Sequence, residues 1–402
     1  MQGPLEGVRV VELASWMFVP SGGAVLVDWG ADVIKVEPMT GDPQRGLVTS
    51  GLLPSGTVNF MVEQPNHGKR SVALDLTVPD GREAFFKLIE TADVFLTNYL
   101  PQVRRKLGVD VDDVRARNPR IVVARGSGQG PRGPDAEKGG FDGASFWARG
   151  GLGSVMPDRP DGYPMMQPSP AFGDVMGGLA TAGAVAAALL KRERTGETSV
   201  VDVSLLSTAL WQLSPLVVAS KLFGLDRLPS GDRRLVPNPG VNLFQTSDGR
   251  FLTLMLLQSE KHWDDLAARL ERPELVTDER FATSEARAAN AGACTDVLDE
   301  AFGARPLAHW KEALADFDGV WTAFQTLAEL YDDPQVVANG YLPAAELDQG
   351  PVQFVASPAQ FDEAAVDITR APEHGEHTEL ILLELGYDWD DITSFKEAGA
   401  IL

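Results

Sequence analysis

VRVVELASWMFVPSGGAVLVDWGADVIKVE, residues 8–37, is the stretch that decides the fold. Residues 8–13 form a short apolar run typical of a strand, and residues 21–29 are small and apolar, as in a closely packed helix. Residues 31–37 read as a second strand. A strand, a helix and another strand in such close succession predict a compact βαβ unit.

The same alternation recurs further along the chain. Residues 71–76, 94–97 and 121–124 are predicted strands, and the helix opened by Pro79-Asp80-Gly81 extends to Ala92. This pattern predicts an α/β fold with a mostly parallel, Rossmann-like sheet. A long helix of small residues is predicted from Val175 to Arg194, followed by Gly196.

The chain length of 402 residues favours at least two packed units. Residues 228–240 are a plausible linker, and Ser247-Asp248-Gly249 predicts a hairpin turn at the start of a second region. Amphipathic helices are expected to about residue 316, and a helix is expected at residues 378–385.

Composition bounds the partners. Hydrophobic residues make up 44% and charged residues 23% of the chain, as in ordinary globular proteins. The net charge of -22 argues against a nucleic-acid or anionic-membrane surface, so an anionic ligand needs a local cationic patch. We expect no apolar run of the roughly 18 residues that span a bilayer and no leader sequence, and therefore predict a cytoplasmic protein.

Several familiar catalytic motifs are missing from the sequence. It contains no GxSxG, GxxxxGK[ST] or HExxH pattern, and its five histidines show no metal spacing, so no metal site is predicted. Gly126, Gly128 and Gly130 precede Pro131, which favours a turn-rich loop over a dinucleotide loop. The single cysteine, Cys294, excludes an internal disulfide and is predicted to be a buried, inert thiol.

Asp174 in the string AFGDVMGG, residues 171–178, is the sharpest catalytic candidate. It precedes the long predicted helix, where free N–H groups and the helix dipole favour an ionised carboxylate. Aspartate is also a preferred N-cap residue, and capping competes with nucleophilic attack. Local sequence leaves both roles open.

Seven segments occur in an order that resembles the class III CoA-transferases. They are PLEGVRVVEL (4–13), GADVIKVEPMTGDPQR (30–45), NHGKRSVALDL (66–76), ADVFLTN (92–98), AFGDVMGGL (171–179), DPQVVANG (333–340) and APEHGEHTELILLELGY (371–387). The family includes formyl-CoA and carnitine CoA-transferases and shares its fold with 2-methylacyl-CoA racemase. The resemblance implies a large α/β CoA-binding domain at residues 1–200, completed by 328–402, a linker helix at 201–225, a small α+β domain at 226–327, and an interlocked homodimer.

The resemblance also implies the chemistry. Gly173-Asp174 matches the family's nucleophile, which forms an aspartyl anhydride and then an aspartyl-CoA thioester, with acyl-CoA and a carboxylic acid as substrates and no further cofactor. The racemase alternative lacks a His-Asp pair, because Phe141-Asp142 stands there. A third alternative is a non-catalytic acyl-CoA-binding protein in which Asp174 is a cap.

The resemblance assigns further residues to the two ends of the substrate. Pro38 replaces a basic residue found in relatives after the second strand, for which Arg45 is a possible substitute, and His67 is a weaker candidate. The acyl-site candidates are Phe141, Asp142, Trp16 and Met17, with Phe18, Trp147, Met165 and Met166 as further apolar candidates. The CoA-binding candidates are Ser15, Phe18, Lys69, Arg70, Asn98, Tyr99, Arg104, Arg105, Lys106 and Lys138.

Overall fold

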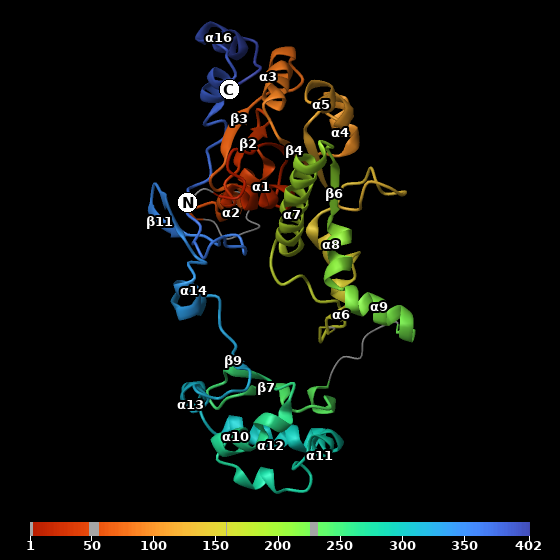
Figure 1. The fold of residues 1–402 in the computed structure, drawn as a ribbon, viewed down its shortest axis with the longest axis vertical. Coiled ribbons are helices and arrows are strands. Elements are labelled where there is room, and N and C mark those ends of the chain that lie inside the picture. Colours follow the sequence, from red (N-terminus) through yellow and green to blue (C-terminus); the bar gives the residue numbers. More distant parts are fainter. Residues whose placement is uncertain (1–2, 48–55, 158, 226–231) are drawn as a thin grey trace. The chain divides into compact units, whose positions relative to one another are not determined.

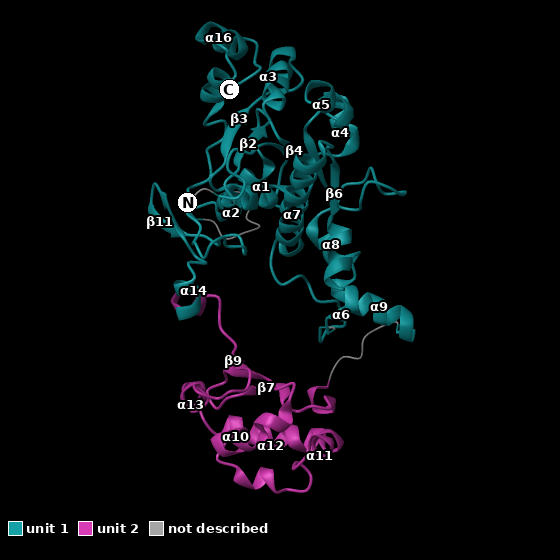
Figure 2. Cartoon of the chain, in the orientation of Figure 1, with its two compact units in different colours: residues 1–228, 334–402 teal, residues 229–333 magenta. Residues whose placement is uncertain are grey.

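The chain divides into two compact units, coloured separately in Figure 2. The computed structural model describes residues 3–47, 56–157, 159–225 and 232–402. Unit 1 comprises Met1–Leu228 and Pro334–Leu402, and unit 2 comprises Pro229–Asp333. The predicted linker at residues 228–240 lies partly outside the described residues.

Unit 1 is built on one six-stranded parallel sheet (Figure 1). The strand order is β3-β2-β1-β4-β5-β6, and every neighbouring pair is parallel, as the sequence predicts. The order reverses between β1 and β4, and ligands of open parallel sheets bind at the carboxyl ends of the strands at such a point. The strands are β1 (Arg9–Leu13), β2 (Asp32–Glu37), β3 (Arg70–Ala73), β4 (Val94–Thr97), β5 (Val122–Ser127) and β6 (Val200–Ser204).

The strands alternate their side chains between two cores, one on each face of the sheet. Val11 and Ile34 face one core, which α3 (Pro79–Glu90), α15 (Thr378–Glu384) and α16 (Trp389–Glu397) complete. The end of the chain thus returns to the first domain, with α16 beside α3 and β3 (Figure 1).

Val10 and Val33 face the second core, which is covered by three helices. They are α1 (Phe18–Asp28), α7 (Phe172–Thr195) and α8 (Leu205–Gln212). Both α1 and α7 begin three residues earlier than the sequence predicts, so Asp174 lies inside the first turn of its helix.

Helices α1 and α7 approach each other through glycines. A Cβ at Gly178 would lie 2.8 Å from the backbone nitrogen of Gly22, and a Cβ at Gly22 would lie 2.9 Å from the Gly178 carbonyl oxygen. Any larger residue at this crossing forces the helices apart, because backbone atoms cannot yield as a flexible side chain can. The contact brings the N-terminal part of α7 close to the turn between β1 and α1.

The expectation that no apolar run reaches membrane-spanning length is wrong for α7. This helix has 24 residues, and its most apolar window has a mean hydropathy of 1.5, so it is long and apolar enough to cross a membrane. In the structure it packs against α1 and the sheet, and its small residues form part of the second core. A buried core helix of this composition passes the same length test.

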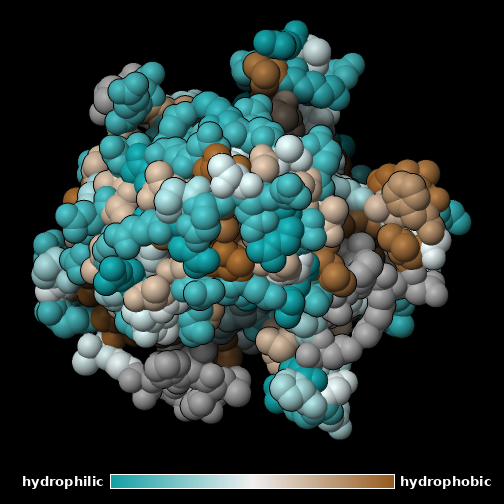
Figure 3. Space-filling view, turned by 90° about the horizontal axis from the view of Figure 1, so that it is seen from below, coloured by the Kyte–Doolittle hydropathy of each residue, from teal (hydrophilic) through white to brown (hydrophobic). Residues whose placement is uncertain are grey.

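The remaining elements of unit 1 surround the sheet. Residues 201–225, predicted as a linker helix, begin as the edge strand β6 and continue as α8 and α9 (Ser214–Phe223). No residue of α9 is buried, and Figure 3 shows hydrophobic residues gathered at the edge where α9 lies in Figure 1. The other elements are α2 (Phe60–Asn66), α4 (Pro101–Leu107), α5 (Val111–Arg117), a π-helical turn (Asp142–Ala148), α6 (Leu152–Val155), α14 (Pro334–Ala338), β10 (Ala344–Leu347) and β11 (Gly350–Gln353).

Unit 2 is a small α+β unit. Its antiparallel sheet joins β7 (Val241–Gln245), β8 (Phe251–Met255) and β9 (Trp321–Ala323). The predicted hairpin turn is confirmed, and Gly249 has the φ of +77° that favours glycine there. The main helices are α10 (Ser259–Arg269), α11 (Ser284–Ala289), α12 (Ala291–Gly303) and α13 (Leu307–Ala313). Cys294 is buried in α12, and burial raises the pKa of its thiol to about 12.

Candidate active site

A cavity of about 400 Å³ opens at the carboxyl ends of β1 and β4, where the strand order reverses. Ser15 and Trp16 reach it from the turn after β1, and Asn98 and Tyr99 reach it from the end of β4. Asp174 enters from α7, so the three elements that meet here all belong to unit 1. The other lining residues are Phe18, Pro38, Thr40, Gly41, Pro43, Leu100, Val103, Gly126, Ser127, Gly128, Gly139, Gly140, Phe141 and Leu205.

Asp174 does not cap its helix. The α7 N-cap position is Ala171, which has a φ of 59°, and the backbone N–H of Gly173 donates to Asp142 Oδ1 at 3.1 Å. Asp142 therefore supplies the capping oxygen from a distant loop, while Gln167 Nε2 donates to its other oxygen at 3.2 Å. Within the described residues, no hydrogen bond to the Asp174 carboxylate is formed, so its oxygens are free to react.

Two carboxylates lie near this helix end, and neither forms an ion pair with any residue that the structure describes. Burial, and secondarily the charge of Asp142, raises the pKa of Asp174 to about 7. Burial also raises the pKa of Asp142, although the bonds from Gly173 and Gln167 oppose that shift. Asp174 is consequently close to half ionised at neutral pH, and it is a more basic carboxylate than an exposed aspartate.

Glycines allow the cavity floor to close. A Cβ at Gly128 would lie 2.7 Å from the Gly140 Cα, and a Cβ at Gly140 would lie 2.1 Å from Ser145 Oγ. A Cβ at Gly173 would lie 2.2 Å from the nearest ring atom of Phe146. The chain can therefore pass close beneath Asp174 only because these positions carry no side chain.

The predicted acyl-site residues take different positions. Trp16 and Phe141 line the cavity, with their ring centroids 5.6 Å apart in an edge-to-face arrangement. Met17 instead packs with Met61 and Ala171, and Asp142 lies behind the cavity wall as the cap of α7. Of the further apolar candidates, Phe18 lines the cavity, Trp147 is in the second core, and Met165 and Met166 are exposed.

The predicted CoA-binding residues also divide into groups. Ser15, Phe18, Asn98 and Tyr99 line the cavity. Lys69 does not: it is buried, and its Nζ donates to Glu12 Oε2 at 2.8 Å, to the Pro20 carbonyl and to Asn66.

The remaining basic candidates lie elsewhere on the surface of unit 1. Arg70 pairs with Asp32 and Glu384, and Lys138 pairs with Asp135. Lys106 is exposed on α4. None of these three side chains lines the cavity that holds Asp174.

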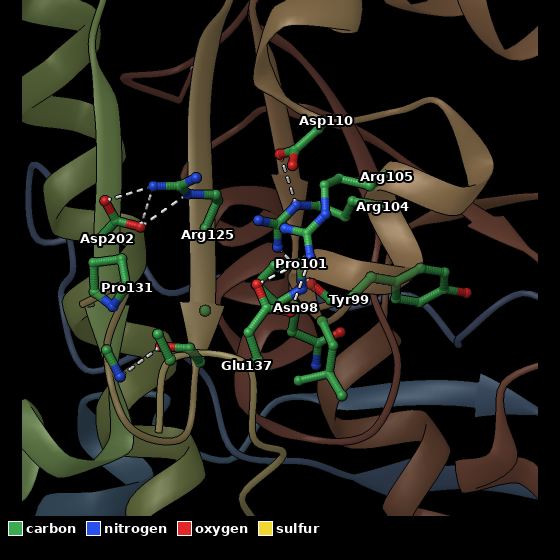
Figure 4. A pocket seen from close by; sticks show the side chains of 15 residues that line it. Asn98, Tyr99, Pro101, Arg104, Arg105, Asp110, Arg125, Pro131, Glu137 and Asp202 are labelled. Atoms are coloured by element: carbon green, nitrogen blue, oxygen red, sulfur yellow. Dashed lines mark hydrogen bonds and ion pairs between the residues drawn. The ribbon is translucent and has the colours of Figure 1, made fainter. Parts of the chain in front are cut away.

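A second cavity of about 230 Å³ adjoins the first and shares the Asn98–Leu100 and Gly126–Ser127 segments with it. Arg104 and Arg105 line it from α4, and Figure 4 shows Arg125 directed at Asp202 on the neighbouring strand. Arg104 donates to Asp110 and to the Tyr99 carbonyl. This cavity gathers three guanidinium groups beside the site, and each of them is paired with a carboxylate that also lines the cavity: Arg104 with Asp110, Arg105 with Glu137 and Arg125 with Asp202.

A buried ionic cluster beneath the site escaped sequence reasoning. Glu12 and Lys35 stand in apolar strands on the face toward α1, and Lys35 Nζ lies 3.3 Å from Glu12 and 2.9 Å from Asp42. Burial alone lowers the pKa of Lys35, but Asp42, Glu12 and Glu37 hold it above its ordinary value. For Lys69 burial prevails and lowers the pKa to about 8. The sequence signal that could have revealed this cluster is a charged residue inside each of two apolar strands, Glu12 in VVEL and Lys35 in VIKVE.

Two further candidates are structural in their contacts. Arg45 donates to Glu37 through two nitrogens, and it lines a different cavity. Burial alone would raise the pKa of Glu37, but Arg45 and Lys35 outweigh burial and lower that pKa to about 2. His67 is buried, with Nε2 2.7 Å from Asp28 Oδ1 and Nδ1 2.8 Å from the Gln64 carbonyl. Both residues tie loops to the core.

The model of one protein family, described as CoA-transferase family III, matches residues 5–378. The chain belongs to CoA-transferase family III. This family III enzyme is 31% identical to the (R)-2-hydroxy-4-methylpentanoate CoA-transferase of Clostridioides difficile over 401 residues, 99% of each chain. It is 29% identical to the cinnamoyl-CoA:phenyllactate CoA-transferase of Clostridium sporogenes, covering 99% of this chain and 97% of that one.

The fold of this CoA-transferase agrees with solved structures. A crystal structure of a CAIB/BAIF family protein from Brucella suis superposes with a TM-score of 0.81 and 30% identity, covering 96% of this chain and 100% of that chain. The enzyme is therefore a CoA-transferase, and its family implies an acyl-CoA and a carboxylate as substrates.

Proposed function

We propose that this enzyme moves CoA between carboxylic acids with Asp174 as the covalent nucleophile. The observation that carries the proposal is the division of labour between the two carboxylates. Asp142 caps α7, so Asp174 projects into the cavity with both oxygens uncommitted. An uncommitted, raised-pKa carboxylate in a cavity suits nucleophilic catalysis.

The reaction balances without any cofactor other than the CoA thioester. An Asp174 oxygen attacks the thioester carbonyl, the C–S bond breaks, and an aspartyl-acyl anhydride and CoA thiolate result. The thiolate attacks the Asp174 carbonyl carbon, which releases the donor acid and leaves an aspartyl-CoA thioester. The acceptor carboxylate then attacks this thioester, and the thiolate finally takes the new acyl group and restores the Asp174 carboxylate.

The arrangement of the two cavities supports a proposal for which end of CoA lies in each of them. The thioester must reach Asp174 in the first cavity, and the phosphates need cations in an otherwise acidic protein. Arg104 and Arg105 stand in the adjoining cavity, beyond Asn98 and Tyr99, and a phosphate would replace Glu137 as the partner of Arg105 in the exposed pair of these two residues. We therefore propose that the pantetheine arm lies in the first cavity and that the nucleotide end extends toward α4.

The assembly is part of the same proposal. The family resemblance implies an interlocked homodimer, and α9 offers a surface that such a partner would cover, with Trp211 82% and Phe223 72% exposed near it. Burial of large apolar side chains is the usual driving force for a stable dimer. We also propose that the enzyme works in the cytoplasm, away from membranes and nucleic acid.

The test is chemical trapping of Asp174. The enzyme is incubated with an acyl-CoA, treated with borohydride or hydroxylamine, digested, and the peptide that contains Asp174 is examined by mass spectrometry. We expect a modified Asp174, and we expect Asp174→Asn to lose transfer activity on the order of 10³-fold or more.

The controls separate this proposal from its rivals. CoA transfer with an unmodified Asp174 would sink the covalent mechanism. Exchange of the α-hydrogen in deuterated water without an acceptor acid would point to the racemase. Tight acyl-CoA binding without turnover across a broad panel of acids would point to a binding protein. The control variant is Asp135→Asn, which changes the carboxylate that pairs with Lys138 and should leave transfer unchanged.

A further inference from the structure

The main chain at Trp16 adopts the left-handed conformation, with a φ of 69°. This conformation is uncommon for a bulky residue because its Cβ crowds the neighbouring carbonyl oxygen. Trp16 follows β1 and stands two residues before α1, on the wall of the cavity that contains Asp174. Backbone strain of this kind persists only where the surroundings hold it in place.

Two neighbouring segments hold Trp16. On one side, the Ser15 N–H donates to Asn98 Oδ1 at 3.0 Å, and Asn98 Nδ2 donates to the Ser15 carbonyl at 2.6 Å. On the other side, the Trp16 N–H donates to Asp42 Oδ1 at 3.1 Å. Asp42 is itself buried, and its second oxygen lies 2.9 Å from Lys35 Nζ. The conformation of Trp16 is therefore imposed from the buried ionic cluster.

The indole of Trp16 meets a second aromatic ring from another loop. It contacts Phe141 edge to face, and Phe141 is 64% exposed although it is a large apolar residue. Phe141 directly precedes Asp142, the cap of α7, so its ring is close to the helix end that carries Asp174. Each ring is thus anchored through a buried carboxylate, and the pair forms one wall of the reaction cavity.

The charge of the cavity and its two aromatic rings both favour an apolar acyl group. Among the described residues that line it, every side chain other than Asp174 is neutral. A second carboxylate on the substrate would meet Asp174 with Asp142 behind it, and like charges in a partly buried site repel. Flat rings and branched apolar groups would instead pack against the indole and phenyl faces.

We propose that Trp16 and Phe141 are specificity-determining residues that select acyl groups with a ring or a branched apolar side chain over dicarboxylic acyl groups. Asp42 acts as a positioning residue through Trp16. The inference rests on the proposed function, because it requires the acyl group to sit beside Asp174.

The test compares kcat/KM for three donors, 3-phenylpropionyl-CoA, acetyl-CoA and succinyl-CoA, with one fixed acceptor acid. The wild type should prefer the phenylpropionyl donor by about tenfold or more over both others, in the range that an apolar pocket discriminates. Trp16→Gly should lose about tenfold on that donor while acetyl-CoA changes less than about threefold. Trp389→Ala, an exposed tryptophan outside the cavity, is the matched control and should change none of the ratios.

The role of Asp42 is tested through the same ratio, which does not depend on the amount of folded enzyme. Asp42→Ala, which removes the oxygen that accepts from the Trp16 N–H, should reduce the preference for phenylpropionyl over acetyl in the wild-type background and should reduce it no further in Trp16→Gly. Trp16→Gly should also melt at a higher temperature than Trp16→Ala, because glycine adopts a φ of 69° without strain.

The results that overturn the inference differ from those that overturn the proposed function. A wild type that uses succinyl-CoA best, or a Trp16→Gly variant that loses equally on all three donors, removes the specificity role while CoA transfer stands. An Asp42→Ala variant with unchanged ratios removes the positioning role. Absence of transfer from every donor, together with an unmodified Asp174, removes the proposed function itself.

Discussion

Two groups of buried charges lie close together in unit 1, and they are managed in opposite ways. Beneath the turn after β1, Glu12 and Asp42 face Lys35 and Lys69 at ion-pair distances. At the start of α7, Asp174 lies near Asp142, and no cation among the described residues pairs with either carboxylate. The first group compensates each charge that it buries, and the second group leaves one carboxylate uncompensated.

The paired charges support the fold, and the unpaired carboxylate is suited to chemistry. A compensated buried charge is costly to disturb and holds loops in place, as Asp42 holds the main chain of Trp16. An uncompensated buried carboxylate has a raised pKa and reacts more readily, at a cost in stability. A buried carboxylate therefore supports the fold where a lysine pairs with it, and has a raised pKa where no lysine does.

The largest effect on stability is expected from breaking the compensated group. Glu12→Gln leaves Lys69 and Lys35 facing each other with one carboxylate fewer, which should lower the free energy of unfolding by roughly 3–5 kcal/mol. Urea denaturation followed by circular dichroism measures it. Lys138→Ala breaks the exposed pair with Asp135 and serves as the control that should not shift the midpoint. An equal shift for both variants would mean that burial of the cluster contributes nothing.

A smaller effect of opposite sign is expected at Asp174. Its pKa is raised from 3.8 to about 7, so the folded state holds this proton more tightly than the unfolded state does. The contribution of Asp174 to stability should therefore fall as the pH rises from about 4 to about 7 and stay level above that. Asp174→Asn removes this loss and should melt at a higher temperature than the wild type at pH 8.

The pH series provides the control for that substitution. The melting temperatures of the wild type and Asp174→Asn should converge at about pH 4, where both side chains are neutral. A gain of the same size at every pH would show that the effect comes from packing, and the contrast between the two charge groups would then fail at this helix.

The smallest effect is a shift in the pH profile of transfer. Asp142→Asn keeps an oxygen for the Gly173 N–H but removes the negative charge, which is the second cause of the raised pKa of Asp174. The pH of half-maximal kcat/KM should move downward, because Asp174 then ionises more easily. Asp135→Asn should leave the profile in place. An unchanged profile in Asp142→Asn would confine Asp142 to capping.

The sheet could be predicted from the sequence, but the separate roles of Asp142 and Asp174 at the start of α7 could not. The apolar runs predict the strands of the parallel sheet closely, because buried parallel strands have the most regular hydrophobic pattern. Whether Asp174 caps its helix depends on Asp142, which is 32 positions away and approaches only through the tertiary fold. No local propensity contains that information.

Lys69 shows the converse difficulty. The family resemblance assigns Lys69, in the segment NHGKRS, to the CoA-binding residues. In the structure a glutamate from β1 lies within hydrogen-bond distance of it, and Gly23 leaves the space that this pair fills. Pairing across 57 residues cannot be derived from either segment alone.

The glycine crossing of α1 and α7 has a consequence for how this enzyme can change over time. The spacing between the turn that carries Trp16 and the helix that carries Asp174 is set by backbone against backbone at Gly22 and Gly178. In the proposed mechanism, this crossing holds the reacting carboxylate in place independently of the Trp16 side chain. Substitution of Trp16 can then change the choice of substrate while Asp174 keeps its position, which is how one framework can acquire many specificities.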